Sequence, residues 1–422
     1  MKRKSLFLLA IYLILSGLIY GQTNENNGLQ SSEDNHPDTL FSRGVDELIR
    51  ESDVAKKEEK YKVLITKFPE DGGEFRKMKF NNVRISLVLL WSSRGNGEKV
   101  MEYYNQVKDG LSPGLGVAFA GNLVKNHHYE KALTILNDLM AAITTYATEK
   151  SSIYTYLQAY DYYAQALFEL GKKEEALKYA RDAYDKSDKK NTQVNSTYSK
   201  VLNGLDRHEE ALPIMENLVR DGMATDEIKN LYRKSYIHNG GSSGTYDKQV
   251  ASLVKELKEK MEKEAKEKLI NEPAYHFSLT DMNGKTVSLQ DLKGKVVILD
   301  FWATWCGPCI NSMPAMQKLV NKYKNDPRIA FLFIDTGEKI PDYEAAVKKF
   351  MDEKKYDFHV LFDVRDPITK KCPVATGYLI TGIPTKLVLD GNGRLRYRVV
   401  GFSGGFDATV EELTAMIENV KM

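Results

Sequence analysis

The hydrophobic period of this 422-residue chain changes near Pro273, and the change predicts two kinds of structure. Over residues 41–239 and 250–269, apolar residues recur every three to four positions, which is the period of a helix face. From Ala274 onward, short apolar runs alternate with helical patterns, as in strands buried in a sheet. We therefore predict a multidomain chain in which an all-α region precedes an α/β domain.

Length and composition place the chain among globular proteins of more than one domain. A single core rarely extends over 422 residues, so two or three domains are expected. The hydrophobic share of 42% and the charged share of 28% are ordinary for such proteins. The net charge of +2 offers little attraction for nucleic acid, and we predict no nucleic-acid partner.

The first 21 residues have the pattern of a secretory signal peptide. Basic residues 2–4 precede the apolar run 6–15, and the small Gly21 stands where cleavage would occur. A signal peptide would export the protein to the periplasm of a bacterium. The alternative is an uncleaved segment that anchors the protein to the inner membrane, because residues 6–20 are nearly all apolar.

Residues 22–40 are polar and are predicted to form a linker. In the helical region that follows at 41–249, the tetrapeptide Glu-Glu-Ala-Leu occurs at 174–177 and again at 209–212, a shift of 35 residues. This period, with a small alanine that lets two helices approach closely, resembles tetratricopeptide-like helix pairs. The resemblance implies a helical-repeat domain, and we expect this domain to hold a protein partner or to position the domain that follows it.

Residues 250–272 are predicted to form a charged amphipathic helix that connects the two domains. Its apolar stripe consists of Val250, Leu253, Val254, Leu257, Met261 and Ala265. Around this stripe, glutamates precede lysines by four positions, which stabilises the solvated surface of a helix. Because the stripe is short, packing on neighbouring helices is favoured over a dimeric coiled coil, and Pro273 is expected to end the helix.

The C-terminal domain is predicted over residues 273–422 as a mixed sheet with helices on both faces. The expected strands are residues 296–302, 329–335, 359–362, 385–390 and 394–400. The expected helices are residues 306–324, 343–354 and 410–421. Asp-Gly-Asn-Gly at 390–393 is a hairpin signal between the last two strands.

Cys306 and Cys309 flank Gly307 and Pro308 at the point where the first of these strands passes into a helix. With Cys372 as the one further cysteine, the chain is not a disulfide scaffold, so the pair indicates redox chemistry. A thiolate at a helix start is stabilised by free N–H groups and by the helix dipole. Because exchange needs one thiol to attack and one to resolve, we predict that Cys306 attacks and Cys309 resolves.

Other interpretations of the cysteines stay open at this point. The pair would also fit a structural disulfide or half of a zinc site, but zinc needs further Cys or His ligands, and His276 and His359 are isolated. We therefore predict no metal and no cofactor. Cys372 is expected to be a partly buried bystander, with an additional redox thiol as the alternative.

Residues 300–309, together with Gly-Ile-Pro-Thr at 382–385, resemble thioredoxin. The hairpin pattern at 277–289 and the helical insertion at 340–355 are similar to those of exported TlpA-like thiol–disulfide oxidoreductases. The resemblance covers residues 272–422 and implies a thioredoxin fold for that part of the chain.

The resemblance also assigns roles to individual residues. Pro384 matches the proline that the family holds in the cis form beside the redox pair. Asp300 matches the buried acid of thioredoxin, which implies proton exchange with Cys309; a structural acid at the end of a strand is the alternative. Substrate contacts are implied for Trp305, Gly307, Pro308, Ile383 and Pro384.

The leading functional hypothesis is an exported enzyme that reduces substrate protein disulfides with electrons from a membrane or exported donor. Gly307-Pro308 is the pair found in thioredoxin and favours reduction. A thiol peroxidase is the first alternative, but such enzymes carry a threonine three residues before the attacking cysteine, whereas Thr304 lies two residues before Cys306. The second alternative is a helical-repeat scaffold with an auxiliary redox domain.

Overall fold

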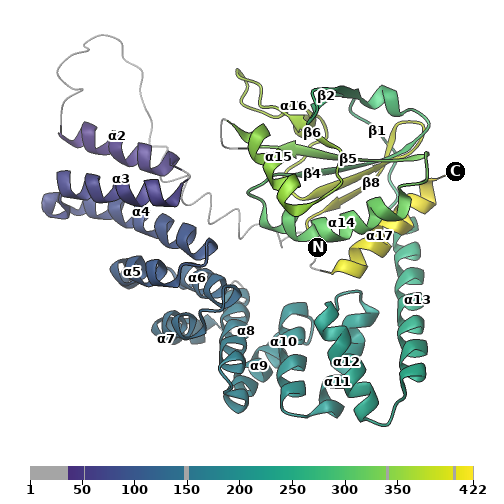
Figure 1. Ribbon diagram of the computed structural model, residues 1–422, viewed down its shortest axis with the longest axis horizontal. Helices are drawn as coiled ribbons and strands as arrows, with labels where there is room; N and C mark the ends of the chain where they lie inside the picture. The colour runs from purple at the N-terminus through teal and green to yellow at the C-terminus, as the bar shows by residue number, and fades with distance from the viewer. Residues whose placement is uncertain (1–36, 52, 147–151, 339–341, 403–404, 422) are drawn as a thin grey trace. The chain divides into compact units, whose positions relative to one another are not determined.

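The computed structural model describes residues 37–421 except 52, 147–151, 339–341 and 403–404 (Figure 1). The predicted signal peptide and most of the predicted linker lie outside these ranges. The chain divides into two compact units, Met1–Arg207 and His208–Met422, a division that lies upstream of the predicted domain boundary at residue 249. Within the described ranges, none of the helices combines the length and the apolar character that a membrane crossing requires.

In the described residues of the first unit, the regular secondary structure is helical throughout. Its helices are α2 (Pro37–Arg50), α3 (Val54–Lys67), α4 (Glu74–Ser93), α5 (Gly97–Val107), α6 (Pro113–Lys125), α7 (Tyr129–Thr145), α8 (Ile153–Glu169), α9 (Lys173–Lys186) and α10 (Thr192–Gly204). Helix α2 includes residues 37–40, which were predicted to belong to the linker. The fixed φ of Pro37 suits the first turn of a helix.

The helices of this unit form a stack of pairs. Helices α4 and α5, α6 and α7, and α8 and α9 pack against each other, and α4, α6, α8 and α10 contact one another in turn. Ala176, Ala180 and Ala183 are buried on α9, where small side chains allow the close approach of α8. The assignment of these pairs to tetratricopeptide repeats stays a prediction.

The second unit begins with three helices, α11 (His208–Arg220), α12 (Asp226–His238) and α13 (Ser243–Glu267). Helix α13 starts earlier than predicted, because Ser242 and Thr245 form a capping box at its N-terminus. It ends at Glu267 and not at Pro273, which lies in a short strand. Leu253, Leu257 and Met261 are buried, and the helix packs on the C-terminal helix α17 (Phe406–Val420).

An eight-stranded mixed sheet forms the centre of this unit, in the order β1-β8-β7-β4-β5-β6-β2-β3. The strands are β1 (Glu272–Pro273), β2 (Ser278–Asp281), β3 (Thr286–Ser288), β4 (Val296–Trp302), β5 (Ile329–Thr336), β6 (Val360–Asp363), β7 (Thr385–Leu389) and β8 (Arg394–Val400). Strands β4, β5 and β6 are parallel, and the other neighbours are antiparallel. The five predicted strands and both hairpins are present within one residue of their predicted ends, while β1 was not predicted.

The central strand β4 is buried along its whole length and contributes to two cores. On one face, Ile298 and Trp302 pack with residues of α14 (Gly307–Tyr323), α15 (Tyr343–Lys354) and α17 (Figure 1). On the other face, Leu299 and Phe301 pack with α16 (Pro373–Gly377) and with the 3-10 helix η5 (Leu289–Leu292). The structure thus confirms an all-α region followed by an α/β domain, with helices on both faces of the sheet. Because of the strand alternation, Asp300 lies on the α14 face.

Candidate redox site

Cys306 and Cys309 are joined by a disulfide at the start of α14, directly after the loop that follows β4. Cys306 is the N-cap residue, and its Sγ accepts the backbone N–H of Cys309 at 3.2 Å. Free N–H groups at this end of the helix stabilise a thiolate on Cys306 when the disulfide is reduced. Cys306 is 4% exposed and Cys309 is 1% exposed, so both residues are buried in the oxidised protein.

Pro384 follows a cis peptide bond after Ile383, as the resemblance implied. It leads directly into β7, which pairs with β4 so that Thr385 lies opposite Phe301. The register brings the cis-proline to the end of β4 from which the loop to Cys306 departs. Ile383 packs against the core cluster that contains both cysteines, so the two segments belong to one site.

Two tryptophans flank the cysteine pair in different ways. Trp302 is 1% exposed, belongs to the same core cluster as the cysteines, and packs against Phe350 of α15. Trp305 is 48% exposed and donates its indole N–H to the carbonyl of Gly337 at 3.1 Å. Trp305 is therefore an anchored but accessible surface beside Cys306, whereas Trp302 is part of the core.

Asp300 faces a charged partner that the sequence analysis missed. In the sheet register Asp300 lies directly opposite Lys386 of β7, and Lys386 Nζ is 3.3 Å from Asp300 Oδ1. Both side chains are almost fully buried, and the contact is an ion pair without well-aligned hydrogen-bond geometry. Burial raises the pKa of the Asp300 carboxyl above its ordinary value, and the charge of Lys386 opposes part of this rise.

Two further acids, Glu338 and Asp335, lie near the segment that precedes the cysteines, and neither was identified from the sequence. Glu338 accepts the backbone N–H of Thr304 at 2.6 Å and its hydroxyl at 3.1 Å. Asp335, at the end of β5, is 2% exposed. Burial and the charges of Glu338 and Asp363 raise the pKa of Asp335 to about 9, so this carboxyl is protonated at neutral pH. The one sequence signal for Asp335 was its position as a charged residue near the end of the largely apolar strand β5.

Cys372 is a buried free thiol at the N-terminus of α16. Across the described ranges, no group of three or more His, Cys, Asp or Glu side chains is arranged to hold a metal ion.

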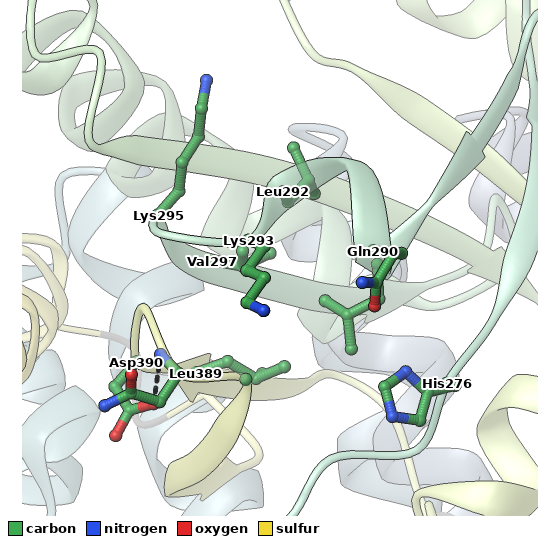
Figure 2. Close-up of a pocket in the computed structure, with 11 residues that line it drawn as sticks. His276, Gln290, Leu292, Lys293, Lys295, Val297, Leu389 and Asp390 are labelled. Atoms are coloured by element: carbon green, nitrogen blue, oxygen red, sulfur yellow. Dashed lines mark hydrogen bonds between the residues drawn. The ribbon is translucent and has the colours of Figure 1, made fainter.

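A cavity of about 200 Å³ lies elsewhere in the redox domain, and His276, Gln290 and Lys293 are among the residues that line it (Figure 2). Val297 and Leu389, at the opposite ends of β4 and β7 from the cysteines and the cis-proline, also line this cavity. It is therefore separate from the candidate redox site.

A disulfide at the start of the helix that follows a central strand, beside a cis-proline, defines a thioredoxin-fold redox domain. The AhpC/TSA family profile matches residues 270–398. The thiol-disulfide oxidoreductase ResA of Bacillus cereus (strain ZK / E33L) is 33% identical over 156 residues, which are 37% of this chain and 81% of that protein. The thioredoxin-like protein YneN of Bacillus subtilis (strain 168) is 37% identical over 125 residues, which are 30% of this chain and 68% of that protein.

Among solved structures, a thiol:disulfide interchange protein of the thioredoxin family from Chlorobium tepidum TLS is 30% identical and aligns with a TM-score of 0.28 over 34% of this chain and 95% of its own. Through its C-terminal domain, the chain belongs to the thioredoxin-fold thiol–disulfide oxidoreductases and is an oxidoreductase. The helical first unit lies outside the residues matched by the AhpC/TSA profile.

Proposed function

We propose that this enzyme works outside the cytoplasm and reduces disulfides of substrate proteins by dithiol exchange through Cys306 and Cys309. The observation that carries the proposal is the Cys306–Cys309 disulfide at the N-terminus of α14, with an N–H group directed at Cys306 Sγ. A structural disulfide has no need of this placement, whereas an attacking thiolate is stabilised by it.

In the reduced protein, the Cys306 thiolate attacks one sulfur of the substrate disulfide. The S–S bond of the substrate breaks, one substrate sulfur leaves as a thiolate, and the other is joined to Cys306. Cys309 then loses its proton and attacks Cys306 Sγ, which releases the second substrate thiolate and forms the intramolecular disulfide. The substrate gains two electrons and the cysteine pair loses two. Asp300 is the proposed acceptor of the Cys309 proton.

The surface proposed for the substrate surrounds the cysteine pair. Trp305 supplies exposed aromatic area, and Gly307 carries no side chain that would obstruct an approaching chain. Pro308, Ile383 and the cis-Pro384 complete the proposed contact surface. The loop before β7 offers backbone groups with which an extended substrate segment would pair.

The N-terminal sequence supports the proposed location, since its basic start and apolar run are typical of an export signal. An exported reductant meets an oxidising compartment, so it requires a membrane or exported electron donor. The Gly307-Pro308 pair supports the reducing direction. The stack of helix pairs in the first unit supports a role in holding a protein partner.

Reduction of insulin by the full-length protein, with a dithiol as the electron source, tests the proposed activity. Cys306→Ser is expected to abolish it, and Cys372→Ser is the matched cysteine control that retains it. Faster consumption of hydrogen peroxide than of insulin disulfides would favour the thiol peroxidase instead. Retention of the biological role by Cys306→Ser in cells would favour the scaffold.

Trapping in intact cells tests the division of labour between the cysteines. Cys309→Ser is expected to accumulate mixed disulfides with substrate proteins through Cys306, because the resolving thiol is absent. Equal trapping by Cys306→Ser would contradict the assignment of Cys306 as the attacking thiol. The captured proteins would also identify the substrates.

A further inference from the structure

Lys386 is a buried lysine within the redox domain. Its side chain is 2% exposed, and it lies in the strand that follows the cis-proline. A lysine in such a place is costly unless it is paired, and the partner here is the Asp300 carboxylate at 3.3 Å. The arrangement is set by the sheet, because the two residues are direct partners in the β4–β7 register.

Ser312 connects this ion pair to the resolving cysteine. Lys386 Nζ donates to Ser312 Oγ at 3.3 Å, and Ser312 Oγ donates to the backbone carbonyl of Cys309 at 2.8 Å. Ser312 is 1% exposed, so these contacts are shielded from solvent. A continuous series of polar contacts therefore runs from Asp300 through Lys386 and Ser312 to Cys309.

Within the described ranges, the elements packed around Asp300 other than β7 place no further charged side chain against its carboxyl. Among the described residues, Lys386 is the charged group that acts on the Asp300 carboxyl. The register partner of Asp300 on β5 is the apolar Phe333. Helix α14 contributes Ser312 and its first turn with Cys306 and Cys309, which we call the cysteine turn. The nearby acid on β5, Asp335, interacts with Glu338 and Asp363 instead. The residues that α17 buries in this core cluster are all apolar.

We propose that Lys386 is a positioning residue that favours the ionised form of the Asp300 carboxyl and orients it for proton transfer from Cys309, while Ser312 links the lysine to the turn that contains Cys306 and Cys309. The proposal rests on the proposed function, since it concerns the resolving step of disulfide exchange. In that step the Cys309 thiol gives its proton to Asp300, and its electron pair forms the new bond to Cys306 Sγ. The bond between Cys306 and the substrate breaks, and its electron pair leaves on the substrate sulfur, which takes up a proton from solvent or from Asp300.

Removal of the lysine has a definite consequence for the pH dependence of resolution. Burial raises the pKa of Asp300, and Lys386 is the group that lowers it. Without the lysine, the carboxyl holds its proton to higher pH and accepts the Cys309 proton less often near neutrality. The rise of the resolution rate with pH should therefore shift to higher pH in Lys386→Met.

The experiment mixes pre-reduced full-length protein with one equivalent of a chromogenic aromatic disulfide under single-turnover conditions. Attack by Cys306 releases the first coloured thiolate, and resolution by Cys309 releases the second. The rate of the second phase is recorded against pH for the wild type, Lys386→Met, Lys386→Arg, Ser312→Ala and Asp300→Asn. Lys349→Met, at an exposed lysine of α15, is the matched control.

For Lys386→Met we expect a second phase about tenfold slower near neutral pH, with its pH midpoint displaced upward. Lys386→Arg should restore much of the profile, and Ser312→Ala should produce a smaller shift in the same direction. In an Asp300→Asn background, Lys386→Met should cause no further shift; this double variant carries neither buried charge and guards against a variant that misfolds. An unchanged pH profile in a folded Lys386→Met protein would overturn the proposal.

These results separate the positioning role from the proposed function. If the wild type releases no second thiolate, disulfide exchange through the cysteine pair fails as a whole. If the wild type shows both phases and Lys386→Met shows the same second phase at every pH, only the role of Lys386 fails.

Discussion

Asp300 and Lys386 face each other across two antiparallel strands in the core of the redox domain, with 3.3 Å between carboxylate and ammonium. Neither side chain has appreciable contact with solvent. A pair of this kind gains little net stability, because the attraction between the charges is offset by their loss of hydration. Its presence next to the cysteine turn is better explained by chemistry than by stability.

This relationship predicts strongly coupled effects on stability. Asp300→Leu leaves the Lys386 ammonium buried without a counter-charge and should lower the free energy of unfolding by ~3–5 kcal/mol. The double variant Asp300→Leu/Lys386→Met removes both charges and should lie within ~2 kcal/mol of the wild type. Urea unfolding of the oxidised proteins measures both values. Losses that simply add in the double variant would show that the two side chains do not interact.

Because the pKa of Asp335 is raised in the folded protein, we expect its contribution to the free energy of unfolding to fall as pH rises. In the folded state its pKa is about 9, whereas an exposed carboxyl ionises near 3.8, so between these values the folded protein binds one more proton than the unfolded chain. The free energy of unfolding therefore decreases with pH in this window, by at most about 1.4 kcal/mol per pH unit. Asp335→Asn should flatten this slope and stabilise the protein at alkaline pH.

The measurement is urea unfolding at several pH values for the wild type and for Asp335→Asn. Asp352→Asn makes the same chemical change at an exposed position of α15 and serves as the control. Equal slopes for Asp335→Asn and the wild type would show that Asp335 is ionised in the folded state at neutral pH.

The sequence was sufficient to predict the strands and most helices of the redox domain, because their cores are continuous apolar runs bounded by turn residues. Strand β4 was predicted with its exact bounds from seven residues of which only Asp300 is charged. The start of α13 was not, because the local cap formed by Ser242 and Thr245 outweighed the apolar stripe on which the prediction relied. Strand β1 has two residues and carries no periodic signal at all.

The site was predictable where its residues are adjacent in sequence and not where they meet through the sheet. Cys306 and Cys309 follow from local spacing, and Pro384 follows from a short motif. Lys386 is 86 residues from Asp300 in the sequence and meets it only through the strand register. Glu338 is 34 residues from Thr304 and meets it only because the chain after β5 returns to the segment before the cysteines. The sequence signal that could have pointed to a buried partner of Asp300, a lysine within the largely apolar strand β7, was not used.

Trp305 should discriminate between large and small disulfide substrates. Its side chain is 48% exposed beside Cys306, so a protein substrate can bury it, while a small disulfide reaches the sulfur without doing so. Trp305→Ala should lower kcat/KM for insulin by about tenfold and change the rate with a chromogenic aromatic disulfide by no more than about twofold. Trp305→Phe keeps an aromatic ring without the N–H donor to Gly337 and should retain more activity with insulin.

The control for this prediction is Tyr275→Ala, which removes another partly exposed aromatic side chain of the same domain. It should leave the rates with both substrates near those of the wild type. Equal losses with insulin and the small disulfide for Trp305→Ala would indicate a disturbed cysteine turn and not a lost substrate contact.

A substitution at Gly222 tests whether the turn between α11 and α12 packs on helix α17 of the redox domain. Gly222 has a φ of +68°, its carbonyl accepts the N–H of Ala408 on α17 at 3.0 Å, and an added Cβ would lie 2.5 Å from that nitrogen. Gly240 has a similar φ of +87° but open space where a Cβ would be. Gly240→Ala should therefore cost only the ~1–2 kcal/mol of a left-handed alanine. Gly222→Ala should cost a further ~1–3 kcal/mol in urea unfolding, because the turn between α11 and α12 must separate from α17. Equal losses in the two variants would show that this turn does not pack on α17 in solution.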